Sequence, residues 1–297
     1  AFFFPVMMLL IGLSTILTIY IGGQEYIAGN ISGNGTILEF VIYINMLTWP
    51  VTAIGWVTSI IQRAAASQTR INEFLATKPS ISNPTNKKSK IKGNIKFNNV
   101  HFTYPESGIT AIKGISFEIN AGETLAIIGK TGSGKSSIIN LLLRNYDTNQ
   151  GEIYIDNNDI KSINLNEFRE NVGLVPQEVF LFSDTIENNI AFGYKNNLPD
   201  KSIIEEAAKN AAIYSNIKEF PDGFKTRVGE RGVTLSGGQK QRISIARAII
   251  KSPKILIFDD CLSAVDTETE DKILNNLNRI MKDKTSIIVS HRVSSAK

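Results

Sequence analysis

A glycine-rich segment between a predicted strand and a predicted helix constrains the fold of this chain most. Residues 129–136 read Gly-Lys-Thr-Gly-Ser-Gly-Lys-Ser, after the apolar run 124–128 and before a predicted helix at 136–143. A short continuous apolar run is typical of a buried parallel strand. The segment fits the pattern G-x-x-x-x-G-K-[S/T] in its strand–loop–helix context, so its backbone N–H groups are expected to surround phosphate groups. The sequence therefore predicts an α/β fold with a phosphate loop.

Two uncharged stretches precede this region. Residues 1–24 and 40–62 contain no charged side chain, and each is long enough to cross a hydrocarbon core of ~30 Å as a helix. The connecting loop, predicted at 25–39, lacks Lys and Arg, whereas Arg63, Arg70 and Lys78 follow the second stretch. This asymmetry places the loop outside the cell and the C-terminal part of the chain in the cytosol. Two buried core helices of a soluble protein are the alternative.

The composition changes near Lys78, and residues 78–92 are rich in Pro, Ser, Asn and Lys, which is typical of a linker. From Gly93 onward, alternating strand patterns give way to continuous apolar runs at 124–128 and 255–258, and helical patterns cover 203–213 and 239–251. These patterns predict an α/β core with an antiparallel β edge and a helical insert. The net charge of +4 gives no support for a nucleic-acid partner, and a single cysteine excludes an internal disulfide.

A second glycine-containing motif lies before the run at 255–258. The motif consists of Leu235, Ser236, Gly237, Gly238 and Gln239. The glycines leave backbone N–H groups uncovered, and the serine adds a hydroxyl at the start of a predicted helix. Together these groups make an anion-binding surface. The pentapeptide lies downstream of the phosphate loop and upstream of a strand ending at Asp259. This order resembles ABC-type ATPases, in which the pentapeptide is the signature motif.

With the two uncharged stretches in front, the chain resembles ABC exporters that fuse a transmembrane domain to an ATPase domain. The resemblance implies that residues 1–77 are the last two transmembrane helices, that 78–92 form the linker, and that 93–297 are an ATP-binding domain cut short at its C-terminus. It also implies that four further spans lie upstream of Ala1. The fold class expected is an α-helical transmembrane segment followed by a P-loop ATPase domain with an antiparallel β subdomain and a helical subdomain.

The resemblance implies ATP and Mg²⁺ as ligands and assigns roles to single residues. Lys135 would reach the β- and γ-phosphates. Mg²⁺ would be held by Ser136, Gln177 and Asp259, and Asp260, His291 and Gln177 would be catalytic. Asp266 matches the loop that crosses the dimer interface. The full ATP-binding set is Tyr104, Gly129, Lys130, Thr131, Gly132, Ser133, Gly134, Lys135, Ser136 and Ser137.

Two of these assignments have an ordinary structural alternative. Tyr104 matches the aromatic residue that stacks on adenine, and a core tyrosine at a β edge is the alternative. Gln177 follows Pro176 and could belong to a plain surface turn. Nearby, Phe180, Leu181 and Phe182 offer an apolar surface for a coupling helix of the transmembrane domain, or they are buried inside the helical insert.

Residues 255–259 resemble the family's Walker B motif, which ends in Asp259. Asp260 departs from the family pattern, which has glutamate after this aspartate. The aspartate side chain is one methylene shorter and holds its carboxylate back by roughly 1 Å, a misplacement that can cost ~100-fold in rate. In one hypothesis the chain belongs to a heterodimer in which its own site binds ATP but hydrolyses it slowly. In the other, the chain forms a homodimer in which Asp260 acts as the base.

The function expected from the resemblance is ATP-driven export of an unidentified substrate. Two half-transporters, identical or different, would meet head to tail, surrounded by membrane lipid. The signature of one chain would then face the ATP of the other. The expected location is a bacterial cytoplasmic membrane with the ATPase domain in the cytosol. A soluble ABC ATPase, an importer ATPase and a regulatory nucleotide-binding subunit are the rival readings.

Overall fold

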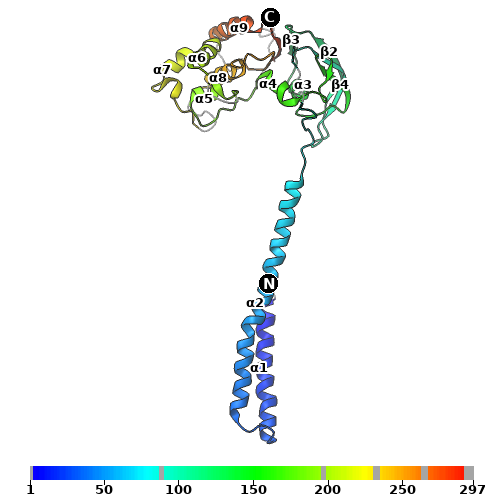
Figure 1. Ribbon diagram of the computed structural model, residues 1–297, viewed down its shortest axis with the longest axis vertical. Helices are drawn as coiled ribbons and strands as arrows, with labels where there is room; N and C mark the ends of the chain where they lie inside the picture. The colour runs from blue at the N-terminus through cyan, green and yellow to red at the C-terminus, as the bar shows by residue number, and fades with distance from the viewer. Residues whose placement is uncertain (1–2, 87–89, 195–198, 230–234, 262–266, 291–297) are drawn as a thin grey trace. The chain divides into compact units, whose positions relative to one another are not determined.

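A computed structural model describes residues 3–86, 90–194, 199–229, 235–261 and 267–290. Contacts divide the chain into two compact units, Ala1–Pro79 and Ser80–Lys297. The first unit is helical and the second combines two sheets with helices (Figure 1).

The first unit consists of two antiparallel helices, α1 (Phe3–Ile27) and α2 (Asn34–Ala76), which lie side by side over part of their length (Figure 1). Both are long and apolar enough to cross a membrane. The hydroxyls of Thr15, Thr48 and Thr52 donate to the carbonyl four residues earlier in the same helix, so these polar groups are satisfied without water. The two predicted spans are confirmed as helices.

The connection between the two helices is shorter than predicted. The sequence favoured a loop over 25–39, but α1 continues to Ile27 and α2 already begins at Asn34. A Cβ on Gly22 of α1 would lie 3.0 Å from Ile37, so the two helices approach closely at this point. Ile37, in the predicted loop, therefore packs against α1 as part of α2. At its other end α2 runs without a break to Ala76, beyond the uncharged stretch that ends at residue 62.

The second unit contains two four-stranded sheets. The antiparallel sheet has the order β2-β1-β4-β5, formed by β2 (Thr110–Ile119), β1 (Ile95–Thr103), β4 (Gln150–Ile155) and β5 (Asn158–Asp159). The parallel sheet has the order β3-β8-β7-β6, formed by β3 (Thr124–Ile128), β8 (Thr285–Ser290), β7 (Ile255–Asp259) and β6 (Val172–Val175). The predicted parallel core with an antiparallel β part is therefore present.

Helices α5 to α8 gather on one side of this unit, with β2 and β4 on the other (Figure 1). The helices of the unit are α3 (Lys135–Leu142), α4 (Leu165–Glu170), α5 (Ile186–Ala191), α6 (Lys201–Asn210), α7 (Tyr214–Glu219), α8 (Gly237–Ile249) and α9 (Thr267–Met281), with a short 3₁₀ turn at Gly223–Lys225. The helices predicted at 203–213 and 239–251 are α6 and α8, each displaced by about two residues. Ala212 has a φ angle of 53°, so α6 ends before the predicted residue 213, and α8 ends at Ile249, three residues before Ser252, where the φ angle is 49°.

Strand β7 separates two hydrophobic cores. Its side chains alternate: Ile255 and Ile257 belong to the core shared with the antiparallel sheet and α3, whereas Leu256 and Phe258 belong to the core shared with α5, α6 and α8. All four are buried. A strand buried on both faces needs a continuous apolar run, which is the pattern that predicted it.

Part of the predicted linker is held on the second unit. The Asn83 side chain accepts a hydrogen bond from the Leu165 N–H at 2.9 Å, and the Asn164 side chain donates to the Thr85 carbonyl at 2.9 Å. Ile91 is buried in the core beside α3. These contacts attach the segment to α4 and to the antiparallel sheet. The domain limits at 77 and 93 remain predictions.

Thr285 joins three segments of the second unit. Its buried hydroxyl donates to the Gly93 carbonyl at 2.7 Å and accepts from the Gly122 N–H at 3.2 Å. Thr285→Val keeps the shape but leaves both backbone groups without this partner, so the free energy of unfolding should fall by about 1–3 kcal/mol. Urea unfolding measures it. Thr110→Val, at an exposed β2 hydroxyl, is the matched control, and equal losses in the two variants would contradict the assignment.

Candidate nucleotide-binding site

The predicted nucleotide residues follow the strands of the parallel sheet. The phosphate loop follows β3, Asp259 ends β7 with Asp260 directly after it, and Gln177 lies two residues beyond β6. Because the strands are parallel, their carboxyl ends meet at one edge of the sheet, where ligands bind in open α/β sheets. The Ser136 hydroxyl donates to Asp259 Oδ2 at 3.2 Å, so the structure brings the start of α3 into contact with the end of β7.

The loop conformation requires glycine at two positions. Gly132 and Gly134 have φ angles of 80° and 91°, in the left-handed region that side chains rarely adopt. A Cβ on Gly134 would also lie 2.5 Å from the Ala111 carbonyl oxygen. Gly134 is the N-cap of α3, so the chain turns into the helix at the residue before Lys135. Helix N-termini reached through such a turn present backbone N–H groups to phosphate.

Lys135 is buried at the base of the loop. Its ammonium group donates to the carbonyls of Gly129 and Lys130 at 2.8 and 2.9 Å. The positive charge is therefore held inside the ring of backbone that the loop forms. A phosphate group bound there would meet a cation with very little of its charge exposed to water.

The oxygen atoms beside the loop fit a magnesium ion. Ser136 Oγ and Asp259 Oδ2 lie 3.2 Å apart, and Mg²⁺ prefers hard oxygen ligands together with the phosphates of a bound nucleotide. Gln177 is exposed beyond β6 and carries a third oxygen of this kind. These residues fit a bound MgATP.

Asp260 has an unusual backbone conformation. Its φ angle is 46°, which Asp and Asn tolerate better than most residues, and its N–H donates to the Val289 carbonyl at 2.9 Å. The next residue, Cys261, is buried, and burial raises the pKa of its thiol to about 12. The end of β7 is therefore fixed by β8, and the thiol beside it stays protonated.

Tyr104 lies at the end of β1, next to the loop helix. Its hydroxyl forms a 2.9 Å hydrogen bond with Ser137 Oγ, and its half-buried ring packs edge-on against Phe102 and Tyr146, with ring centres 4.7 and 5.3 Å away. These contacts attach the ring to the core. The adenine-stacking role remains a prediction beside the alternative of a core tyrosine.

The pentapeptide at 235–239 begins helix α8. Leu235 is buried, and the exposed Ser236 is the N-cap. Its hydroxyl accepts from the Gln239 N–H at 3.3 Å, while the Gln239 side chain accepts from the Ser236 N–H at 3.0 Å. This reciprocal pair is a capping box. Because α3 belongs to one core and α8 to the other, the two helices cover opposite faces of the parallel sheet.

Residues 112–263 match the family model described as "ABC transporter". They include the phosphate loop, the capped pentapeptide and Asp259. The chain belongs to the ABC transporter family.

Similar proteins extend the likeness to nearly the whole chain. It is 38% identical, over 99% of its length, to the "Multidrug resistance-like ATP-binding protein MdlA" of Escherichia coli (strain K12), of which it covers 49%. It is 36% identical, over 98% of its length, to the "ATP-dependent lipid A-core flippase" of Photobacterium profundum, of which it also covers 49%. The chain spans about half the length of these relatives.

A solved structure, that of a bacterial Atm1-family ABC exporter with ATP bound, matches 96% of the chain with a TM-score of 0.76 and 35% identity, and the chain covers 52% of it. The resemblance to ABC exporters and the expected fold class are therefore confirmed. In this chain the part that matches the family model follows the two membrane-length helices.

Two residues that the family resemblance assigns, Asp266 and His291, lie outside the described residues. Their roles at the dimer interface and at the γ-phosphate stay predictions, as do those of the other assigned residues of this ABC ATPase domain.

The sequence reasoning missed two polar residues of the helical part, Asn189 and Arg247. Asn189 is 1% exposed, and Arg247 is largely buried on α8. The signal was present in the sequence, because Arg247 interrupts the apolar and small residues of Ile243, Ile245, Ala246 and Ala248 on a predicted helix. A long cation at such a position needs specific partners.

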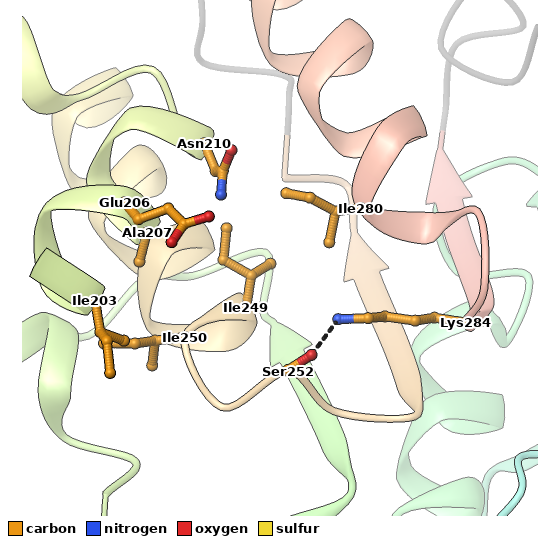
Figure 2. Close-up of a pocket in the computed structure, with 9 residues that line it drawn as sticks. All are labelled: Ile203, Glu206, Ala207, Asn210, Ile249, Ile250, Ser252, Ile280 and Lys284. Carbon is orange, nitrogen blue, oxygen red and sulfur yellow. Dashed lines mark hydrogen bonds between the residues drawn. The ribbon is translucent and has the colours of Figure 1, made fainter. Parts of the chain in front are cut away.

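A pocket of about 280 Å³ lies apart from the nucleotide residues of this ABC domain, between α6, the end of α8 and the end of α9 (Figure 2). Ile249 and Ile280 form apolar walls, and Lys284 donates to Ser252 Oγ at 3.1 Å across one end. Burial, followed by the charge of Lys254, lowers the pKa of Lys284. Among the described residues, none of the predicted ATP-binding side chains lines this pocket.

Proposed function

We infer that this chain is part of an ATP-driven exporter that binds and hydrolyses MgATP and moves an unidentified substrate across a membrane. One observation carries the inference. A phosphate loop, with its lysine and its serine–aspartate oxygen pair at the carboxyl edge of a parallel sheet, occurs in the same chain as two membrane-length helices. A soluble ATPase does not need these helices, and an importer ATPase carries its membrane part on a separate chain.

Each residue of the nucleotide site has its own role in binding and hydrolysing MgATP. The loop N–H groups and the Lys135 ammonium bind and orient the phosphates, and Ser136 with Asp259 and Gln177 holds Mg²⁺. When bound, Mg²⁺ neutralises phosphate charge and supports in-line transfer to water. Asp260 orients the attacking water and accepts its proton, and His291 contacts the γ-phosphate. Catalysis by such a site comes mainly from positioning and electrostatics.

A second half-transporter completes each site. The exposed N-terminus of α8 presents its N–H groups and the Ser236 hydroxyl on the opposite sheet face from α3. A head-to-tail partner would place this end against the phosphates held by the other chain. The expected location is the cytoplasmic membrane of a bacterium, with the ATPase part in the cytosol and lipid around α1 and α2.

The coupling to the membrane part is assigned to the aromatic surface beyond Gln177. Phe180 and Phe182 are 52% and 38% exposed, whereas Leu181 between them is fully buried. Exposed aromatic side chains that lie together are typical of protein contact sites. A cytoplasmic helix of the transmembrane domain is the proposed partner.

The test uses the subunit as the cell makes it. Membranes are washed with carbonate, and the protein is then purified in detergent and assayed for ATP hydrolysis with Mg²⁺ and with EDTA. It should stay in the washed membranes and hydrolyse ATP only with Mg²⁺. Inside-out vesicles should then take up ethidium or a fluorescent lipid only when ATP is added. Release by carbonate would identify a soluble ATPase instead, and ATP binding without turnover would favour a regulatory subunit.

A further inference from the structure

Arg247 links helix α8 to the segment between β6 and α6. Its guanidinium group makes three hydrogen bonds of 2.8 Å: Nε donates to the Asn189 carbonyl, Nη1 to the Phe180 carbonyl, and Nη2 to Asn189 Oδ1. The partners lie 58 and 67 positions away in the sequence. A planar guanidinium can fill several acceptors in fixed directions, which a lysine cannot.

Asn189 extends this link to Phe182. Its Oδ1 accepts from the Phe182 N–H at 2.9 Å, and its Nδ2 donates to the carbonyls of Phe182 and Thr185, both at 3.0 Å. Asn189 is 1% exposed, so these bonds are shielded from water. The oxygen and the nitrogen of the Asn189 side-chain amide therefore both bind the backbone at 182–185, and Arg247 donates to the same amide oxygen.

The same guanidinium lies beneath an aromatic cluster, which consists of Phe180, Phe182 and Phe192. The ring centre of Phe182 lies 5.0 Å from that of Phe180 and 4.3 Å from that of Phe192. Arg247 Cζ lies 5.8 and 5.7 Å from the ring centres of Phe182 and Phe192, within the range of cation–π attraction. The outer faces of the rings are open, and Phe192 is 59% exposed.

Removing this cation from its partners would be costly. Burial lowers the pKa of Arg247 to about 10, so the group is still charged at neutral pH. A largely buried charge is tolerated when it is hydrogen-bonded, and here two backbone carbonyls and one amide oxygen provide the acceptors.

Helix α8 connects this anchor to the pentapeptide. Ser236 caps the helix, and Arg247 lies 11 residues further along, a distance of about 16 Å at the rise of an α-helix. Between them, Ile243, Ser244, Ile245 and Ala246 are buried in the core with α5 and α6. A packed helix of this length moves as one body.

We propose that Arg247 is a positioning residue that fixes the aromatic cluster to helix α8, so that a change at the Ser236 end of the helix is transmitted to the cluster. The inference rests on the proposed function for the ligands at the two ends, namely the partner's ATP at Ser236 and a cytoplasmic helix of the membrane part at the rings. The link itself is a property of this chain.

The first experiment measures hydrogen exchange of the purified full-length subunit without nucleotide. Arg247→Lys keeps a positive charge but cannot reproduce the three bonds. Exchange of amides 180–193 should therefore rise by about tenfold or more. Arg169→Lys is the matched control, because Arg169 also donates to backbone carbonyls, those of Leu143 and Arg144, but lies away from the cluster. Unchanged exchange at 180–193 in Arg247→Lys would overturn the proposal.

The second experiment adds AMP-PNP and Mg²⁺ to the same proteins. In the wild type and in Arg169→Lys, protection at 235–240 should be accompanied by a change at 180–193. In Arg247→Lys, protection at 235–240 should persist while the change at 180–193 is reduced about tenfold. An undiminished change there would refute the link. If nucleotide protects none of these segments in the wild type, the proposed function and the transmission of a nucleotide signal both fail, and the first experiment still decides whether Arg247 holds the cluster.

Discussion

Lys135→Met is expected to lower the ATPase rate of the full-length subunit by about 100- to 1000-fold, the usual cost of removing one aligned donor from a charged transition state. The Lys135 ammonium is buried within the phosphate loop, 2.8 and 2.9 Å from two of its carbonyls. Methionine has a similar length but no charge, so the loop keeps its volume and loses its cation. Steady-state phosphate release measures the effect. Lys113, exposed on β2, is the control, and Lys113→Met should change the rate far less.

A mixed dimer tests whether each ATP site is formed by the phosphate loop of one chain and the pentapeptide of the other. One subunit carries Lys135→Met and the other carries Ser236→Arg, which blocks the exposed cap of α8. In a head-to-tail dimer both defects fall in one site and the second site is intact. The mixed dimer should therefore regain roughly half of the wild-type rate, whereas each variant alone stays inactive. Failure of the mixture to recover any activity would argue against sites formed between chains.

Asp260→Glu is expected to raise the ATPase rate of the subunit purified alone by up to about 100-fold, because the added methylene advances the carboxylate by roughly 1 Å. The backbone opposes part of this gain. The φ angle of 46° at Asp260 suits Asp better than Glu, at a cost of about 1 kcal/mol. The comparison is made at saturating MgATP, so that differences in affinity do not enter.

Asp260→Asn separates the two hypotheses about the dimer. If the chain's own site is slow and a partner supplies a faster one, Asn should leave the low rate of the purified subunit nearly unchanged, and glutamate should raise it. If instead the wild-type rate is high, Asn abolishes it and Glu adds little, then Asp260 is a working base and the transporter is a homodimer. Adding Lys135→Met to the Asp260→Glu protein should also lower its ATPase rate.

The parts of the fold that the sequence predicted best are those set by local patterns. Strands β3 and β7 were predicted within one residue, because a strand buried between two layers must be apolar on both faces. The phosphate loop was predicted equally well. Gly132 and Gly134 have φ angles that glycine adopts at no steric cost, and glycine is the residue that the motif has at the second of these positions. In both cases the determining physics lies within about ten residues.

Features that depend on distant contacts could not be predicted. The early start of α2 accompanies the close approach of Ile37 to Gly22. The polar composition of 78–92 predicts a linker, but the partners of Asn83 and Thr85 lie about 80 positions away. The sequence indicates only that Arg247 needs a partner, and its partner Asn189 lies 58 positions away. Contacts across such separations depend on the finished packing of sheets and helices, which no local pattern encodes.

The protonated, buried state of Cys261 makes these 297 residues a convenient host for site-specific probes. Alkylating reagents attack thiolates, and a thiol with a pKa of about 12 behind β7 offers almost none at neutral pH. A cysteine introduced at Ser32, between α1 and α2, could therefore carry a fluorophore or a spin label while the native thiol stays in place. Measuring whether reagents on each side of the membrane reach that label would then show directly on which side the loop lies.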